Sequence, residues 1–174
     1  MFKAAGSIMD GQIKISFWGR EGSFKGKWEG YEIEISVELI GRGLSEICIC
    51  LYHPFHFQMF VSPKGLLSRI YRIYEANIPK EKISIADIQF DNNYDIWADN
   101  KLRVRDFLTP ERREIIQDLL QRKNHFQFLR VDVDHMNLSK YFRTGIFGLK
   151  KHLFPTQIAE ILRDMVRFIE CRAL

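Results

Sequence analysis

An alternation of apolar and polar side chains over residues 31–39 is the feature that most constrains how this chain can fold. The odd-numbered positions are apolar and the even-numbered ones polar: Tyr31, Ile33, Ile35, Val37 and Leu39 against Glu32, Glu34, Ser36 and Glu38. Side chains on a β-strand point alternately to the two faces of a sheet, so this pattern predicts a strand with one buried face and one wet face. Such strands are typical of antiparallel sheets, since parallel sheets are covered on both faces.

The remaining segments predict more strands and a few helices. Alternating or apolar runs predict strands over 12–17, 44–52, 55–61, 90–98, 101–106, 126–133 and 136–141, with a short glycine-punctuated ribbon around residues 22–30. Apolar residues at helical spacing predict helices after Pro63, Pro110 and Pro155. Because the strands cluster, we predict an α+β fold with a mostly antiparallel sheet of about eight or nine strands and three helices packed on its apolar face.

Two turns are predicted to close hairpins. Asp99-Asn100 separates the runs 90–98 and 101–106, and Asp134-His135 separates 126–133 and 136–141. Asp and Asn favour turns because their side chains bond the local backbone.

The same joint occurs twice, 47 residues apart, as Ser62-Pro63 and Thr109-Pro110. A Ser or Thr can cap a helix that begins with proline, so each joint predicts a strand that ends at a capped helix. We predict one domain over residues 1–174, with a partial internal repeat whose halves would be 12–78 and 86–174.

Composition narrows the class of protein. The chain has 174 residues and a net charge of +4, with neither half strongly basic, and its three cysteines have no disulfide-framework spacing, which favours a reducing compartment. No run approaches the ~20 apolar residues that a membrane-spanning helix needs.

No combination of residues predicts a metal site, a cofactor or a catalytic centre. Cys48-x-Cys50-x-x-His53-x-x-His56 has ligand types that suit zinc, but structural zinc sites favour cysteines two to four residues apart on a turn. Asp132-x-Asp134-His135 is best explained as turn chemistry.

Nucleic-acid binding is not favoured. Lys14, Lys25, Lys27 and Trp28 could form one basic, aromatic platform, but the adjacent strand presents glutamates that would pair with the lysines. A stretch without acids over residues 140–151, which carries Lys140, Arg143, Lys150 and Lys151, predicts as an alternative a basic surface that binds weakly to anionic lipid or nucleic acid.

Three phrases of the sequence occur in a recognisable order: Gly26-Lys-Trp-Glu-Gly30 before an alternating strand, Phe90-Asp91 through Ala98, and Phe107-Leu108-Thr109-Pro110 before a helix. Over residues 24–125 they resemble a family of uncharacterised bacterial proteins, many of which carry one or two membrane spans ahead of a soluble α+β domain. The resemblance implies no known activity and supplies no catalytic residues. We predict a place in the cytoplasm or at the cytoplasmic face of a membrane, since the cysteines favour a reducing compartment and the resemblance is to proteins that often carry a membrane anchor.

These observations lead us to predict a non-catalytic binding or interaction domain, with a protein partner or self-association as the favoured contact. The alternative is a small hydrolase or transferase that uses His53 or His56 with Asp91 or Asp95. The residues predicted to form a ligand site are Trp28, Tyr52, His53 and Trp97.

Overall fold

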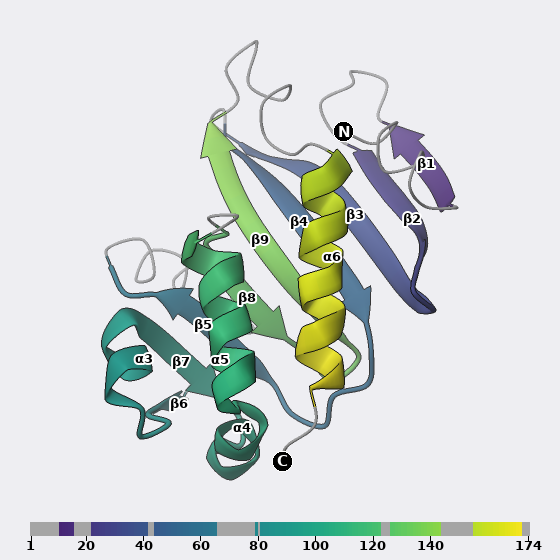
Figure 1. Ribbon diagram of the computed structural model, residues 1–174. Helices are drawn as coiled ribbons and strands as arrows, with labels where there is room; N and C mark the ends of the chain where they lie inside the picture. The colour runs from purple at the N-terminus through teal and green to yellow at the C-terminus, as the bar shows by residue number, and fades with distance from the viewer. Residues whose placement is uncertain are drawn as a thin grey trace.

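The protein is built around one antiparallel sheet (Figure 1). The structure, a computed structural model, describes residues 11–15, 22–41, 44–65, 79, 81–122, 126–143 and 155–171. Within these residues nine strands pair in the order β1-β2-β3-β4-β9-β8-β5-β7-β6, and every pair is antiparallel. The strands are β1 (Gly11–Ile15), β2 (Gly22–Trp28), β3 (Tyr31–Gly41), β4 (Leu44–Tyr52), β5 (Met59–Pro63), β6 (Glu81–Ile83), β7 (Tyr94–Ala98), β8 (Phe128–Val131) and β9 (His135–Arg143).

Helices lie against one face of the sheet, which confirms the α+β prediction. The described helices are α3 (Ile88–Asn93), α4 (Lys101–Phe107), α5 (Pro110–Gln117), a π-helical turn η1 (Asp118–Arg122) and α6 (Pro155–Glu170). Figure 1 shows α5 and α6 side by side across the sheet, with α3 and α4 at its β7 end. We call the face that α5 and α6 cover the inner face, and the opposite one the outer face.

The alternation predicted over residues 31–39 is confirmed in β3 up to Val37, whereas Leu39 is exposed. Ile33, Ile35 and Val37 are buried in the main core, whereas Glu32 and Glu38 are exposed on the outer face. The predicted pairing of lysines with the glutamates of β3 is confirmed for Lys25, whose Nζ lies 2.9 Å from Glu34 Oε2. The main core joins β2 to α6, from Phe24 to Phe168.

A second, smaller apolar cluster lies on the outer face over β8, β5 and β7. Phe60, Trp97 and Phe128 are buried together, with ring centroids 5.4 Å apart for Phe60 and Trp97 and 5.0 Å for Phe60 and Phe128. This cluster explains why β5 has hardly any exposed position.

The two proline joints are not alike. Thr109 caps α5 as predicted, because its side chain accepts a hydrogen bond from Arg112 N, but helix α4 precedes it where a strand was predicted. Ser62 lies inside β5 opposite Asp95, and the strand continues through Pro63. The prediction that Ser62 caps a helix is therefore wrong, and the helix predicted after Pro63 falls outside the described residues.

The first predicted hairpin is also wrong. Residues 88–93 form α3, and Asn100 caps α4 by accepting from Arg103 N, so Asp99-Asn100 begins a helix. The short strand β6, which the sequence does not predict, pairs with β7. The second hairpin and the helix that begins at Pro155 are both confirmed.

Strands from residues 12–78 and 86–174 are interleaved in the sheet. β4 pairs with β9, and β5 lies between β8 and β7. The first half contributes the unbroken run β1 to β4, but its strand β5 is separated from that run by β9 and β8 of the second half. No helix among the described residues is long and apolar enough to cross a membrane.

Candidate functional site

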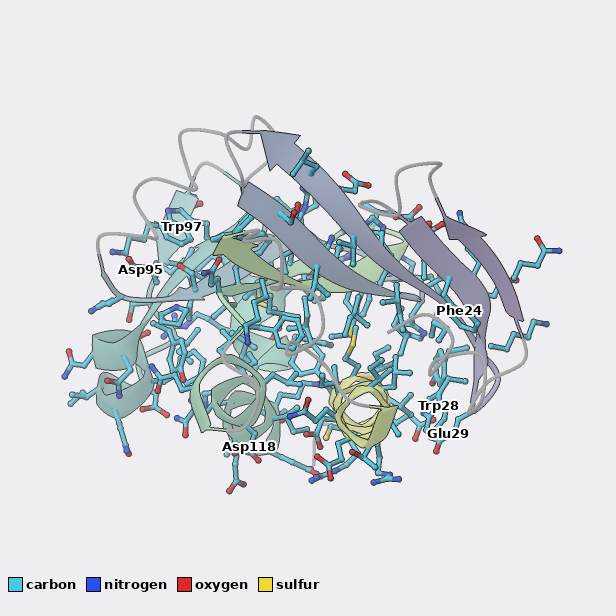
Figure 2. The ribbon with its side chains drawn as sticks, turned by 90° about the horizontal axis from the view of Figure 1, so that it is seen from above. Phe24, Trp28, Glu29, Asp95, Trp97 and Asp118 are labelled. Carbon is cyan, nitrogen blue, oxygen red and sulfur yellow. The ribbon has the colours of Figure 1, made fainter. Side chains whose placement is uncertain are left out.

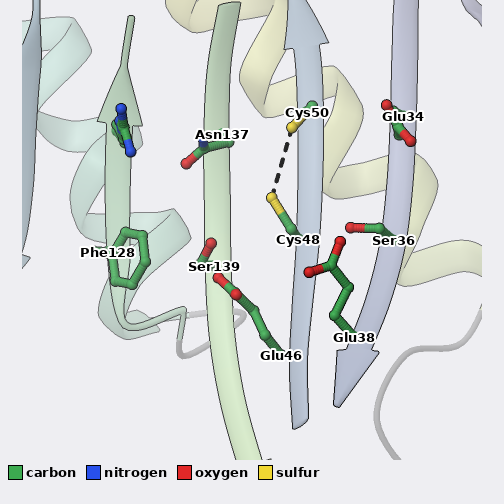
Figure 3. A pocket seen from close by; sticks show the side chains of 10 residues that line it. Glu34, Ser36, Glu38, Glu46, Cys48, Cys50, Phe128, Asn137 and Ser139 are labelled. Carbon is green, nitrogen blue, oxygen red and sulfur yellow. Dashed lines mark hydrogen bonds between the residues drawn. The ribbon is translucent and has the colours of Figure 1, made fainter. Parts of the chain in front are cut away.

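A groove of about 280 Å³ lies on the outer face of the sheet, over β3, β4, β9 and β8 (Figure 3). Three carboxylates line it, Glu34, Glu38 and Glu46, together with the thiols of Cys48 and Cys50. The remaining lining residues are Ser36, Phe128, Arg130, Asn137 and Ser139.

Strand register brings these side chains together. Cys48 is opposite Ser36 on one side and Ser139 on the other, and Cys50 is likewise between Glu34 and Asn137. Since alternate residues share a face, the even positions of β3 and β4 and the odd positions of β9 project together from the outer face. The same alternation that buries Ile33 and Ile35 therefore builds the groove.

The two thiols contact each other. Cys48 Sγ and Cys50 Sγ lie 3.6 Å apart and share a hydrogen bond, and both side chains are only partly buried. That hydrogen bond, burial and the nearby Glu46 charge raise the pKa of the Cys48 thiol well above its usual range. Cys48 is therefore protonated at neutral pH.

The groove is rich in hydrogen-bond acceptors. Among the described residues Asn137 Oδ1 is buried without a hydrogen-bond partner, and the three glutamates add carboxylate oxygens. Arg130, the one cation in the lining, already binds Asp132, with Nε 2.7 Å from Oδ2. A ligand for this groove should therefore donate hydrogen bonds and carry positive charge.

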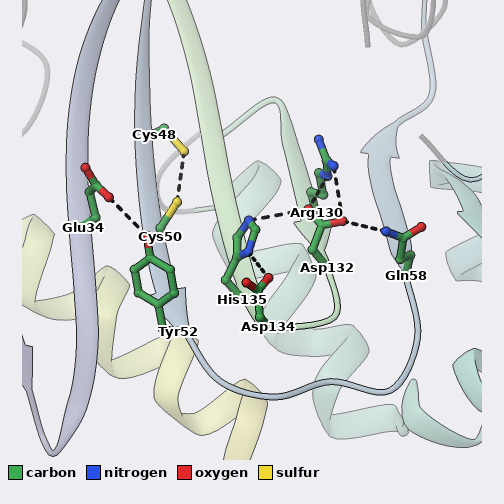
Figure 4. A network of polar contacts seen from close by, with 9 residues as sticks. All are labelled: Glu34, Cys48, Cys50, Tyr52, Gln58, Arg130, Asp132, Asp134 and His135. Carbon is green, nitrogen blue, oxygen red and sulfur yellow. Dashed lines mark hydrogen bonds and ion pairs between the residues drawn. The ribbon is translucent and has the colours of Figure 1, made fainter. Parts of the chain in front are cut away.

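A polar network at the β8–β9 hairpin borders the groove (Figure 4). His135 Nδ1 lies 2.6 Å from Asp134 Oδ1, and its Nε2 lies 3.5 Å from Asp132 Oδ2. Asp132 also accepts from Gln58 Nε2 and Arg130 Nη2. The imidazole holds an aspartate at each nitrogen, so neither nitrogen is left to act as a general base.

Sequence reasoning noticed only part of this network. The predicted turn at Asp134-His135 joins β8 to β9, but the carboxylates of Asp132 and Asp134 contact other side chains, and no local pattern in the sequence points to Gln58 or Arg130. Gln58 directly precedes β5, and Arg130 lies in β8. That both side chains reach Asp132 can be inferred only once the strand order is known.

Tyr52 joins the network to the groove. Its hydroxyl donates to Glu34 Oε2 at 3.1 Å, and its ring lies 5.9 Å from that of His135. Burial is the main cause that raises the pKa of Tyr52 to about 12, and this hydrogen bond is the second cause. Tyr52 is thus the one member of the predicted ligand site that borders the groove.

The other members of the predicted ligand site lie elsewhere. Trp28 lies on β2 against the main core, opposite in face to Lys25 and Lys27, so the predicted basic platform does not form. Trp97 belongs to the outer aromatic cluster on β7, and Figure 2 shows it at the opposite end of the sheet from Trp28.

His53 follows β4, and its ring lies 5.0 Å from Phe55 and 6.1 Å from Tyr31. Burial lowers the pKa of His53. The aspartates predicted to serve it have other partners: Asp91 accepts from Ser84 Oγ, and Asp95 lies 2.6 Å from Lys82 Nζ. The contacts described for His53, Asp91 and Asp95 are therefore with other residues, and the predicted histidine–aspartate pairing is not among them.

The basic surface predicted to bind anionic lipid or nucleic acid is only partly described. Lys140 pairs in register with the buried Ile47, which places it on the inner face, and burial lowers its pKa. Arg143 is the last residue of β9, and Lys150 and Lys151 fall outside the described residues.

Within the described part of the chain no three His, Cys, Asp or Glu side chains are clustered as a ready-made metal site. The Cys48–Cys50 pair is therefore the only feature of the predicted Cys–His pattern that the described geometry brings into contact, and it offers two sulfur ligands.

The sequence matches no protein-family model and no curated protein sequence. Among solved structures, the fold is similar to the crystal structure of the mycobacterial trehalose monomycolate transport factor A, TtfA. The TM-score is 0.53, and the match covers 93% of this chain and 92% of that chain at 10% sequence identity. At that identity the likeness shows a shared fold and carries no residue roles.

Proposed function

We propose that this chain is a non-catalytic binding domain whose outer-face groove holds a positively charged, donor-rich segment of a protein partner. The observation that carries the proposal is the polarity of the groove. Its carboxylates belong to Glu34, Glu38 and Glu46, and its buried Asn137 Oδ1 has no partner among the described residues.

Lysine and arginine side chains supply what such a lining lacks. Both are cations that only donate hydrogen bonds, and a guanidinium can bond two carboxylate oxygens at once. A partner that presented acidic residues would instead be repelled, so the groove favours basic segments by charge as well as by hydrogen bonding.

A role in binding also agrees with the arrangement of the titratable side chains. Both nitrogens of His135 are engaged by aspartates, and His53 packs among aromatic rings. The fold neighbour is named a transport factor, and a transport-associated binding role is compatible with that name. The resemblance to the bacterial family that is often membrane-anchored stays a prediction.

The experiment is a binding titration with a fluorescent lysine- and arginine-rich peptide, followed by anisotropy. The wild-type chain should bind it and should not bind a length-matched glutamate-rich peptide. The double variant Glu38→Gln/Glu46→Gln should weaken binding by about tenfold, the factor that roughly 1.4 kcal/mol produces.

The matched control is Glu160→Gln on α6, which removes an exposed carboxylate on the helix that covers the inner face. It should leave the affinity unchanged. Equal affinities for wild type and the groove double variant, or equal binding of both peptides, would overturn the proposal.

A further inference from the structure

We propose that Cys48 and Cys50 together chelate a thiophilic divalent cation, with zinc as the physiological class, in the outer-face groove. This inference goes beyond the proposed function because it rests on the thiol pair, whereas the binding of a basic segment rests on the carboxylates. The two share the groove and can fail separately.

The distance between the sulfurs supports a chelate. A tetrahedral zinc ion with Zn–S bonds of about 2.3 Å places two sulfur ligands about 3.8 Å apart, and a linear two-coordinate ion with such bonds would need about 4.6 Å. A disulfide requires about 2.05 Å. The observed 3.6 Å is close to the tetrahedral value, so coordination needs little movement of β4.

The strand holds the pair in place. Cys48 and Cys50 lie two residues apart on β4, which pairs with β3 on one side and β9 on the other along both positions. The rule that zinc cysteines lie two to four residues apart applies to closed sites whose ligands come from a turn. Here both cysteines project from the same face of one strand, which brings the two sulfurs together as a turn would. The other coordination positions are left open to water.

The electrostatics of the groove favour a cation. Glu46 from β4 and Glu34 and Glu38 from β3 line the same groove as the two thiols. Carboxylates attract a dication. As each S–metal bond forms, the thiol proton leaves to solvent, so binding should release protons and strengthen as the pH rises. The charged group on the β8 side, Arg130, is bound to Asp132.

The test is a cobalt(II) titration of the full chain, reduced with a phosphine and freed of metal. We expect a thiolate-to-cobalt charge-transfer band in the near ultraviolet, saturating at one cobalt per chain and displaced by zinc. Cys48→Ser and Cys50→Ser should each abolish the band. Cys171→Ser, which removes the third thiol at the end of α6, is the matched control and should keep it.

Several results would overturn the chelate. They are the absence of the band, a band that survives both groove variants, a band lost in Cys171→Ser, or one cobalt per two chains with a dimer mass by light scattering. The peptide titration of the metal-free wild type reports on the proposed function separately. A missing band with normal peptide binding overturns only the chelate, and a normal band with no peptide binding overturns only the proposed function.

Discussion

The sulfurs of Cys48 and Cys50 lie 3.6 Å apart on the outer face of β4, at the floor of a groove whose other ionisable side chains are mostly carboxylates. The hydrogen bond between the two thiols and burial raise the pKa of Cys48, and the nearby Glu46 charge adds to that effect. Neutralising Glu46 should therefore make the Cys48 thiol easier to ionise.

Cys48 should react slowly with iodoacetamide. Because its pKa is raised well above the usual range, little thiolate is present at pH 8, and the thiolate is the nucleophile. Alkylation followed by fragment-resolved mass spectrometry should show Cys48 reacting more slowly in the native chain than in the urea-unfolded chain. Equal rates in the two states would contradict the assigned environment.

The two residues of the proline joints should respond oppositely to alanine. Thr109→Ala removes the cap of α5 and should lower the free energy of unfolding by about 1 kcal/mol. Ser62 Oγ is buried with no hydrogen-bond partner among the described residues, so Ser62→Ala should be neutral or stabilising by up to about 1 kcal/mol. Urea denaturation measures both. A loss of equal size in the two variants would show that Ser62 Oγ makes a stabilising contact and would contradict this prediction.

Ser62 and Thr109 also show how much of the fold a local sequence pattern can predict. The alternation in β3 correctly predicts the sheet class, because a two-faced strand has few other environments open to it. A Ser-Pro or Thr-Pro pair reports only that a helix can start there. At Ser62 the pairing of β5 with β7 prevails over that local tendency, since it satisfies the backbone through strand contacts.

The groove could be predicted in part for the same reason. The strand that carries Cys48 and Cys50 was recognised, and so were the glutamates on the wet face of β3. The neighbours Asn137 and Ser139 come from β9, about 90 residues further along the chain. Only the strand order brings β9 beside β4, and no local spacing encodes that order.

Removal of the buried Arg112 side chain should lower the free energy of unfolding strongly. Its guanidinium donates to Phe107 O at 2.9 Å and Phe168 O at 2.8 Å, and also bonds the carbonyls of Ile169 and Cys171 at the end of α6. Arg112→Ala would remove the guanidinium donor from all four carbonyls, of which Phe107 O keeps the hydrogen bond from Thr109 N, and should cost about 3 kcal/mol in chemical denaturation.

Arg105→Ala is the matched control for Arg112, because Arg105 is exposed in the last turn of α4. It should cost less than about 1 kcal/mol. Arg112→Lys should recover little, since an ammonium cannot reproduce the planar fork. A cost for Arg112→Ala as small as that for Arg105→Ala would show that the link from α5 to the end of α6 does not stabilise the fold.

Folding stability should fall in mildly acidic solution, partly through His53. Burial lowers the pKa of His53, so the unfolded chain binds its proton at a higher pH than the folded chain does. The associated stability is present above the unfolded pKa of about 6.5 and is lost as the pH falls below it. His53→Phe should therefore lose less stability than wild type between roughly pH 7 and pH 5. A loss identical to that of wild type would contradict the assigned burial effect.

The most direct test of the binding surface is to map backbone amide shifts by NMR while the basic peptide is added to the metal-free chain. We predict that the largest shifts fall on residues 34–38, 46–50 and 137–139, the strand segments that line the groove. Shifts centred on residues 140–151, or on the outer aromatic cluster around Trp97, would contradict the central claim that the groove is where this domain binds.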